Sequence, residues 1–325
     1  MDTNVIIRKK KGEGFIYISN KGNIIKDERI LNRIKSFRIP PAWTNVIISR
    51  KDSDIQAMGT DSKDRHQYIY SKEWTSNQER EKFIRLIYFL KNINYIRRYL
   101  KSILKEEGWF REKLIAFIIS IIDICGLRIG NEKYKELYDS HGISTLKRKH
   151  ITIQKNKIKL EFVGKKNVVN TCEIKHKNIV RLFKELDEYN KPNVEDYFLT
   201  INNKIISNAS INNYLKSFGD FTIKDFRTYR ANIEFIKCLY NSDIEQTKYK
   251  TKLVLNKCLD VIADKLNNTR IVLKNKYICK ILIDKYLEES SVFIKKIKYY
   301  KNNKLLDVDE YESTLLYYLH KYKNI

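Results

Sequence analysis

A chain of 325 residues with 42% hydrophobic and 12% aromatic residues can bury a sizeable core, in one large domain or in two unequal ones. Its 64 Lys and Arg residues against 39 Asp and Glu residues give a formal net charge of +25, so a polyanion is the expected partner. The sequence argues against a membrane, because the longest apolar stretch, 114–124, is too short to cross a bilayer and residues 1–11 do not begin a secretory signal.

Residues 1–75 are expected to form a small β-rich domain. Residues 13–25 alternate polar and apolar side chains, which predicts a hairpin that turns on Gly22. A short helix should follow and end before Pro40, because proline disfavours a helical residue ahead of it. Three strands are then predicted, at 46–49, 56–60 and 67–70.

Residues 76–325 are expected to form a larger, mainly α-helical domain. Ser76 and Glu79 fit a capping box at the start of one helix, and another helix is predicted from Leu114 to about Leu127. Alternation then predicts a small antiparallel sheet, with strands at 151–153, 158–162 and 168–174. Helices joined by polar loops should follow residue 177. The predicted fold class is therefore α+β.

Residues that could bind a metal are scattered along the chain. The cysteines contain no CxxC pair, which indicates a reducing compartment and neither zinc nor a redox couple; they are Cys125, Cys172, Cys238, Cys258 and Cys279. The five histidines form no HExxH motif, and there is no GxxxxGK sequence for a nucleotide phosphate. We therefore expect chemistry that needs no metal, no ATP and no cofactor.

Basic side chains stand at two places that suit contacts with phosphate. Lys224 and Arg227 lie three residues apart in a predicted helix and share one face, although such pairs are usually solvated. Arg128 directly follows an apolar helix, where its planar guanidinium can bind two phosphate oxygens. The alternative is a helix end, with Gly126 or Gly130 as the stop and Arg128 favouring the helix dipole.

Lys165 follows Gly164 in the turn between two predicted strands of the small sheet. A lysine can act as a general acid when cationic neighbours and partial burial bring its acidity close to the ambient pH. Lys166 leaves another interpretation open, in which the Lys-Lys turn is an exposed basic tip.

The segment 59–70 brings together several kinds of group that suit DNA. An amide, two aromatic rings and two cations alternate along it, namely Gln67, Tyr68, Tyr70, Lys63 and Arg65. Tyr68 and Tyr70 share a face, which could equally be a core face.

Five segments, in this order, resemble the motifs of the short type IB DNA topoisomerases of poxviruses and mimivirus. They are 59–70, 125–134, 162–165, 224–229 and 267–278. The resemblance implies a β-rich DNA-binding domain and a helical catalytic domain. It also implies a monomer that acts on double-stranded DNA, nicking and resealing one strand through a tyrosine to relax supercoils without metal or ATP.

The resemblance implies a role for each matching residue. Tyr277 would be the nucleophile that forms a 3′-phosphotyrosyl link, and Lys165 would protonate the leaving 5′ oxygen. The phosphate would be held by Arg128, Arg227 and Asn268, with Lys224 assisting. The implied DNA-binding residues are Lys63, Arg65, Gln67, Tyr68, Tyr70, Lys133 and Tyr134.

The chain departs from the family pattern at Arg270, where proline is usual, and this leaves the geometry of the loop open. Asn268 stands where poxvirus enzymes have His, so it can donate a hydrogen bond but no charge. Bacterial and mimivirus-like members also carry Asn at this position.

Two other functions remain open. A tyrosine recombinase shares the catalytic core, but typically has His-x-x-Arg where this chain has Lys224 and Arg227. A non-catalytic DNA-packaging protein would explain the charge but needs no ordered set of phosphate-facing residues. We expect an intracellular location, at a viral factory or in the virion if the chain is viral.

Overall fold

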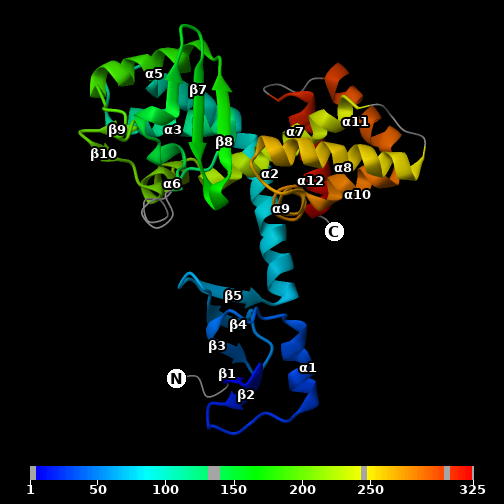
Figure 1. Ribbon diagram of the computed structural model, residues 1–325. Coiled ribbons are helices and arrows are strands. Elements are labelled where there is room, and N and C mark those ends of the chain that lie inside the picture. Colours follow the sequence, from blue (N-terminus) through cyan, green and yellow to red (C-terminus); the bar gives the residue numbers. More distant parts are fainter. Residues whose placement is uncertain (1–4, 131–139, 243–246, 304–307, 324–325) are drawn as a thin grey trace. The chain divides into compact units, whose positions relative to one another are not determined.

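The computed structural model describes residues 5–130, 140–242, 247–303 and 308–323 (Figure 1). Contacts divide the chain into two compact units, Met1–Lys82 and Phe83–Ile325. The division falls within helix α2 (Lys72–Ile103), seven residues beyond the boundary expected from the sequence. Together the units give the α+β class that the sequence predicts, with a β-rich first unit and a mainly helical second unit.

The first unit is built on one antiparallel sheet in the strand order β2-β1-β3-β4-β5. Its elements are β1 (Val5–Lys11), β2 (Gly14–Ser19), α1 (Glu28–Ser36), β3 (Thr44–Ser49), β4 (Ile55–Thr60) and β5 (His66–Tyr70). Apolar side chains from three strands meet Ile34 of α1 in a small core, and these are Ile6, Val46, Ile48 and Ala57. The predicted helix and the three predicted strands after it are confirmed.

The predicted hairpin at 13–25 is wrong in its pairing. The hairpin instead joins β1 to β2, with Lys11 opposite Gly14 and the turn made by Gly12 at a φ of +59°. Glycine adopts this left-handed conformation without the penalty that a side chain carries. Beyond Ser19 the chain does turn back, but it forms only a single bridge, between Ile18 and Ile24.

The second unit packs helices around α3 (Arg111–Cys125), which is buried along most of its length. The helices after it are α5 (Lys177–Asn190), α6 (Asn208–Lys216), α7 (Ile223–Tyr240), α8 (Lys248–Lys265), α9 (Arg270–Lys276), α10 (Lys280–Glu288), α11 (Ser290–Asn302) and α12 (Glu310–Lys323). Figure 1 shows the small sheet beside α3, α5 and α6, with α8, α10, α11 and α12 gathered on the other side of this unit. Contact of α3 with α7 places the end of the apolar helix beside the predicted phosphate-binding helix.

The predicted antiparallel sheet of the second unit is confirmed. Its strands are β6 (Ile151–Ile153), β7 (Ile158–Val163) and β8 (Val169–Ile174), in the order β6-β7-β8. A short 3-10 turn, Lys165–Asn167, joins β7 to β8. Sequence reasoning missed a second, two-stranded hairpin, β9 (Thr200–Ile201) with β10 (Lys204–Ile205).

The starts of two helices differ from the predictions. Helix α2 begins at Lys72, because the Ser71 hydroxyl accepts a hydrogen bond from the Trp74 amide and caps the helix, so Ser76 lies inside it. Helix α3 begins at Arg111 and ends at Cys125, where Gly126 takes the left-handed conformation at a φ of +64°. Gly126 is therefore the helix stop that one of the two sequence interpretations proposed.

Four of the five cysteines form disulfides, which the sequence did not indicate. Cys125 pairs with Cys172 and Cys238 with Cys258, at Cα separations of 5.8 and 5.7 Å. Partners 47 and 20 residues apart meet because α3 packs on β8 and α7 on α8, and spacing alone does not reveal such pairs. The expectation of a purely reduced set of cysteines is wrong for this structure. No helix in the described ranges is both long and apolar enough to span a membrane.

Candidate active site

Helix α7 carries Arg227 into the interior of the second unit. The helix starts with a capping box, in which the Asp225 carboxylate accepts hydrogen bonds from the Thr222 amide at 2.8 Å and the Thr222 hydroxyl at 2.9 Å. An ion pair from Arg85 of α2, at 3.2 Å, holds the same carboxylate. Two residues beyond this anchored turn, Arg227 is only 4% exposed.

The guanidinium of Arg227 keeps an uncompensated positive charge. It donates to the backbone carbonyl oxygens of Gly126 and Leu266, the latter at 2.9 Å. No carboxylate pairs with Arg227 in the part of the chain that the structure describes, and its buried Nε has no partner there. A buried cation is costly unless it meets an anion or several acceptors, so this arrangement suits a negatively charged ligand.

Arg128 and Asn268 contact each other although they are 140 residues apart in the sequence. An Arg128 Nη atom donates to Asn268 Oδ1 at 2.7 Å, and both Nη atoms lie 3.3 Å from the Asn267 carbonyl oxygen. The buried Nδ2 of Asn268 has no hydrogen-bond partner among the described residues. An unsatisfied buried donor beside two arginines can donate to an oxyanion.

Tyr277 lies directly after α9 and faces Arg227. The centroid of its ring is 5.5 Å from the Arg227 guanidinium carbon, so the phenol lies beside that positive charge. Burial acts to raise the pKa of Tyr277, but Arg227 and the charges of Arg128 and Lys224 act in the opposite direction. The net result is a pKa below the ordinary value of a phenol. This electrostatic setting favours the phenolate, which is the nucleophilic form.

Asn232 is a residue of this site that sequence reasoning missed. It is fully buried on α7, and its Nδ2 donates to the Tyr277 carbonyl oxygen at 2.8 Å while its Oδ1 accepts from the Cys279 amide at 2.8 Å. The side chain thus ties the backbone on both sides of Ile278 to the helix that carries Arg227. The available signal was an amide among the apolar residues of the second half of α7, five residues after Arg227.

Arg128, Arg227, Asn268 and Tyr277 form the candidate active-site cluster. Lys224 and Lys165 are both exposed, and of the two only Lys224 has a described interaction with it. Lys224 is close enough for its charge to lower the pKa of Tyr277. Lys165 begins the turn after β7, and no hydrogen bond or ion pair joins it to the cluster in the described ranges. The buried side chain of Asn170 packs against the backbone before Lys165: a Cβ on Gly164 would lie 2.2 Å from Asn170 Nδ2, so any larger residue there would displace Asn170.

The segment 59–70 forms β4, β5 and the turn between them. Asp61 organises the turn, because its carboxylate accepts two hydrogen bonds from the Arg65 guanidinium, at 2.7 and 2.9 Å, and one from Gln67 Nε2 at 2.9 Å. Tyr68 and Tyr70 are 43% and 38% exposed, so they do not form a core face.

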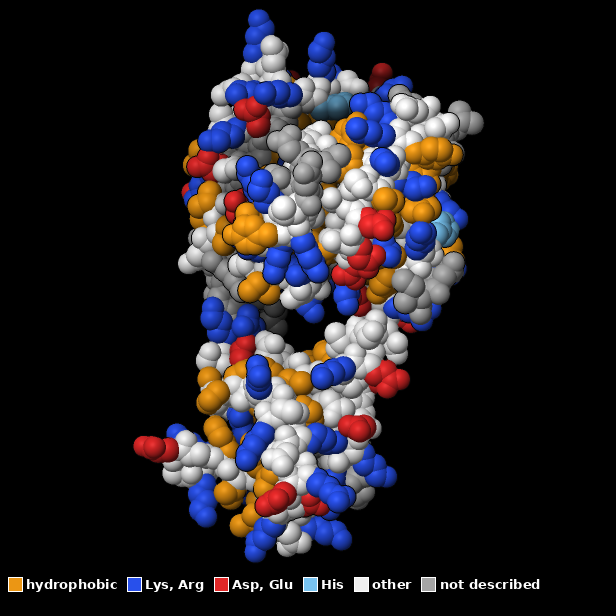
Figure 2. Space-filling model, turned by 90° about the vertical axis from the view of Figure 1, so that its right-hand side faces the viewer, with side chains coloured by type: hydrophobic (Ala, Val, Ile, Leu, Met, Phe, Trp, Pro, Cys, Tyr) orange, Lys and Arg blue, Asp and Glu red, His pale blue; other side chains and the backbone are white. Residues whose placement is uncertain are grey.

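The structure describes some of the other residues expected to bind DNA and not others. Lys63 is exposed in the same turn, and the Tyr70 ring stacks on Trp74 at a centroid distance of 3.9 Å. Lys133 and Tyr134 lie outside the described residues. Figure 2 shows Lys and Arg side chains spread over the displayed face of each unit, which matches the net charge.

Comparison with known proteins gives two family matches. Residues 71–304 match the family described as the catalytic core of eukaryotic DNA topoisomerase I, and residues 14–61 match the N-terminal domain of bacterial DNA topoisomerase IB. The chain belongs to the type IB DNA topoisomerases. It is therefore a DNA topoisomerase, as the resemblance implied.

Related topoisomerases and one solved structure complete the comparison. The chain is 31% identical to DNA topoisomerase 1B of Acanthamoeba polyphaga mimivirus, over 93% of this chain and 92% of that protein. It is 28% identical to DNA topoisomerase 1B of vaccinia virus, over 68% and 72%. A crystal structure of the XerH site-specific recombinase bound to difH substrate aligns with a TM-score of 0.37 and 19% identity, over 71% of this chain and 59% of that one.

The departure from the topoisomerase IB pattern at Arg270 has a simple structural explanation. Thr269 caps α9 by accepting a hydrogen bond from the Val272 amide at 3.3 Å, so Arg270 is the first residue of the helix. Proline is common at this position because the amide there needs no partner within the helix. Arg270 instead forms an ion pair with Asp260 of α8, and the turn between α8 and α9 keeps Asn268 beside Arg128.

Proposed function

We propose that Tyr277 is the nucleophile of this topoisomerase and that Arg128, Arg227 and Asn268 hold the DNA phosphate that it attacks. The observation that carries the proposal is the pairing of a phenol of lowered pKa with a buried guanidinium that no described carboxylate neutralises. Lys224 adds positive charge at the edge of the same cluster.

In the proposed reaction, the Tyr277 oxygen forms a bond to phosphorus and the bond from phosphorus to the 5′ oxygen breaks. Negative charge that develops on the non-bridging oxygens is balanced by the two guanidinium groups and by the free Nδ2 of Asn268. Attack by the 5′ oxygen on the phosphotyrosine reverses the step. The ester conserves the energy of the broken bond, so no ATP is required.

Lys165 is the proposed general acid for the leaving 5′ oxygen. Its exposure and its place at the tip of the β7–β8 connection allow it to approach a bound duplex. Because it does not contact the cluster itself, the DNA would bring the 5′ oxygen to Lys165.

The first unit is proposed to bind the duplex through the β4–β5 turn. Phosphates would meet Lys63 and Arg65, and the half-buried Gln67 with the exposed Tyr68 and Tyr70 would contact the groove. Lys133 and Tyr134 remain proposed DNA contacts from the sequence resemblance. We also propose a monomer that acts inside a cell, at a viral factory or in the virion if the chain is viral, because relatives of similar length come from mimivirus and vaccinia virus.

The test replaces Tyr277 with Phe, which removes only the hydroxyl. The wild-type chain should relax supercoiled plasmid in EDTA and form a covalent adduct that survives denaturant. Tyr277→Phe should do neither, yet bind DNA with an unchanged dependence on salt, because phosphate contacts dominate affinity. An adduct formed by Tyr277→Phe would overturn the assignment of the nucleophile.

A further inference from the structure

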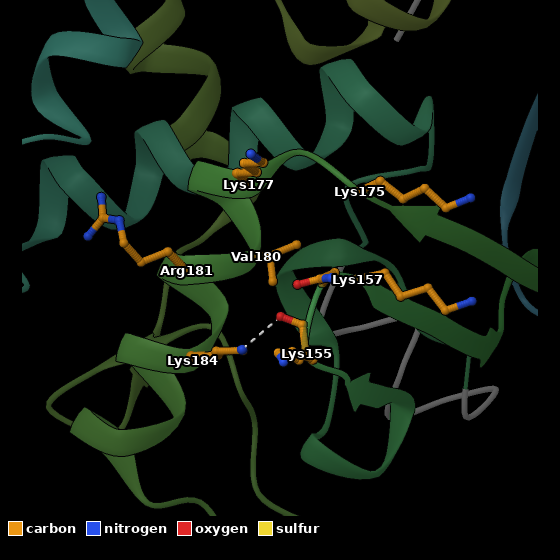
Figure 3. Close-up of a pocket in the computed structure, with 8 residues that line it drawn as sticks. Lys155, Lys157, Lys175, Lys177, Val180, Arg181 and Lys184 are labelled. Carbon is orange, nitrogen blue, oxygen red and sulfur yellow. Dashed lines mark hydrogen bonds between the residues drawn. The ribbon is translucent and has the colours of Figure 1, made fainter.

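A basic pocket lies at the end of the small sheet opposite Lys165. Lys157 directly precedes β7 and Lys165 follows it, so the six residues of this strand separate the two places by about 20 Å. The pocket has a volume of about 700 Å³ between the β6–β7 turn, the end of β8 and α5 (Figure 3). Six cations line it: Lys155, Lys157, Lys175, Lys177, Arg181 and Lys184.

Three of these six cations already have carboxylate partners. Lys157 and Lys175 both contact Glu173, at 2.6 and 2.9 Å, and Arg181 pairs with Glu185 one turn along α5. Because Lys157 and Lys175 share one carboxylate, these three cations and two carboxylates leave one net positive charge.

The other three cations are not neutralised. No carboxylate in the described part of the chain pairs with Lys155, Lys177 or Lys184. Figure 3 shows Lys184 of α5 reaching across to the Lys155 carbonyl oxygen, to which its Nζ donates at 3.0 Å. The contact brings the two segments together, so three uncompensated positive charges border one hollow.

The residues that line the pocket suit phosphate groups better than nucleic-acid bases or apolar ligands. Among the described residues that line the pocket none is aromatic, so bases have no platform on which to stack. Val180 is the apolar side chain of that set, which is too little for an apolar ligand. Lysine ammonium groups on flexible stems contact phosphate as point charges and read no sequence.

We propose that this pocket binds the sugar–phosphate backbone of a second DNA duplex while the first duplex occupies the active site. The inference rests on the proposed function, because it takes the Tyr277 cluster as the site of the first duplex. In supercoiled DNA two segments of one molecule cross, so the second is present at high effective concentration. A site that contacts only phosphate would favour such crossings regardless of sequence.

The experiment traps the enzyme on a short duplex that loses its 5′ fragment on cleavage, so that the active site is filled by covalent DNA. A second, fluorescent duplex of unrelated sequence is then titrated, and its anisotropy gives the affinity. The test variant carries Lys155→Gln, Lys177→Gln and Lys184→Gln together. The control carries Lys257→Gln, Lys295→Gln and Lys298→Gln, which removes three exposed lysines of α8 and α11 that have no carboxylate partner in the described ranges.

The test variant should bind the second duplex about 10-fold more weakly. The plot of the log of the association constant against the log of the salt concentration should also be less steep by about 3 units, one for each lost phosphate contact. The control should bind within about twofold of wild type. Both variants should form the covalent complex at the wild-type yield, which also shows that they fold.

Other results would overturn the proposal in distinguishable ways. If the wild-type chain formed no covalent complex, the proposed function would fail and this inference with it. If the complex formed but the test variant bound the second duplex as tightly as wild type, the pocket assignment alone would be wrong. If polyglutamate displaced the second duplex more effectively than unlabelled DNA of equal charge, the pocket would be a site for acidic protein segments.

Discussion

Two tyrosines of the second unit each lie beside an arginine in nearly the same geometry. The Arg97 guanidinium carbon is 5.3 Å from the centroid of the Tyr229 ring, and the Arg227 guanidinium carbon is 5.5 Å from that of Tyr277. In both pairs the cation is close enough to act on the pKa of the phenol, and Tyr229 lies on the same helix as Arg227. Distance to the cation therefore does not distinguish the two phenols.

Their surroundings differ in where the carboxylates lie. Arg97 pairs with Asp123 at 2.8 Å and with Glu312 of α12 at 3.6 Å, and the Tyr229 hydroxyl donates to the same Glu312. Burial raises the pKa of Tyr229 strongly, and Glu312 raises it further against the effect of Arg97. No described carboxylate lies between Arg227 and Tyr277, and the surroundings of Tyr277 lower its pKa.

The comparison shows how one kind of contact can serve structure or chemistry. An arginine that is neutralised by carboxylates stabilises a neutral phenol as a hydrogen-bond donor between helices. An arginine that is satisfied only by backbone carbonyls keeps its charge for a neighbouring phenolate and for a bound phosphate.

Replacing Arg227 with Gln should have the largest effect, because it removes the charge that sets Tyr277 apart from Tyr229. The rate of covalent adduct formation on a short duplex should fall by about 10²–10³-fold, the usual cost of one group that stabilises an oxyanion. Because Arg227 lowers the pKa of Tyr277, its loss should move the alkaline rise of the cleavage rate to higher pH. A pH profile of single-turnover cleavage measures both effects.

Arg97→Gln is the matched control for that experiment. It removes the same group beside the other tyrosine and leaves the carboxylates of Asp123 and Glu312 without the cation that pairs with both, so it should lower stability and leave the pH profile of cleavage unshifted. Equal shifts of the profile in both variants would contradict the distinction between the two pairs.

The next largest effect on the cleavage rate is expected from replacing Asn232, because this residue holds the backbone of Tyr277. Tyr229 is fixed by its own helix, whereas Tyr277 comes from a separate segment whose backbone Asn232 holds against α7. Asn232→Ala should slow cleavage on the order of 10–100-fold, because a nucleophile misplaced by about 1 Å loses that much, while DNA affinity stays unchanged. Single-turnover rates at saturating enzyme separate the two quantities.

Asn190→Ala controls for the loss of a structural amide. Asn190 Nδ2 also donates to two backbone carbonyl oxygens, those of Phe198 and Thr200, but at the end of α5. It should cost stability without slowing cleavage. If Asn232→Ala weakened DNA binding as much as cleavage, a positioning role for Asn232 would be excluded.

The sequence predicted most of the elements, because each depends on local periodicity or on proline and glycine. The small sheet and the β3–β5 meander follow directly from alternation. The β1–β2 hairpin was misplaced because Gly12 and Gly22 offer equally good turns, and the choice depends on pairing of β1 with β3, a non-local contact.

The candidate site was predicted by resemblance in its principal members, and its energetics came only from the structure. Arg227, Arg128, Asn268 and Tyr277 do meet, but the neutralisation of Arg97 and the bridge from Asn232 involve partners 26 to 215 residues apart in sequence. Such distances carry no periodic signal. The disulfides escaped prediction for the same reason.

The smallest effect on activity is expected from Tyr229→Phe, which removes the hydroxyl that links Arg97 to Glu312. Cleavage should be unchanged, and the free energy of unfolding in urea at pH 7 should fall by about 1–2 kcal/mol, because the buried Glu312 and the partly exposed Arg97 each lose a hydrogen bond. A cleavage rate reduced as strongly as in Arg227→Gln would mean that both arginine–tyrosine pairs serve the chemistry.

The pH dependence of stability gives Tyr229→Phe a second, independent readout. A folded-state pKa above the ordinary tyrosine value of about 10 means that the unfolded chain releases the Tyr229 proton first. The stability that this phenol contributes is therefore complete below about pH 10 and is lost as the pH rises further. Tyr229→Phe should lose less stability than wild type between about pH 9 and 11, so the two unfolding free energies should converge there. Curves that stay parallel over this range would show that Tyr229 ionises as readily in the folded protein as in the unfolded chain, and the contrast with Tyr277 would then lose its electrostatic basis.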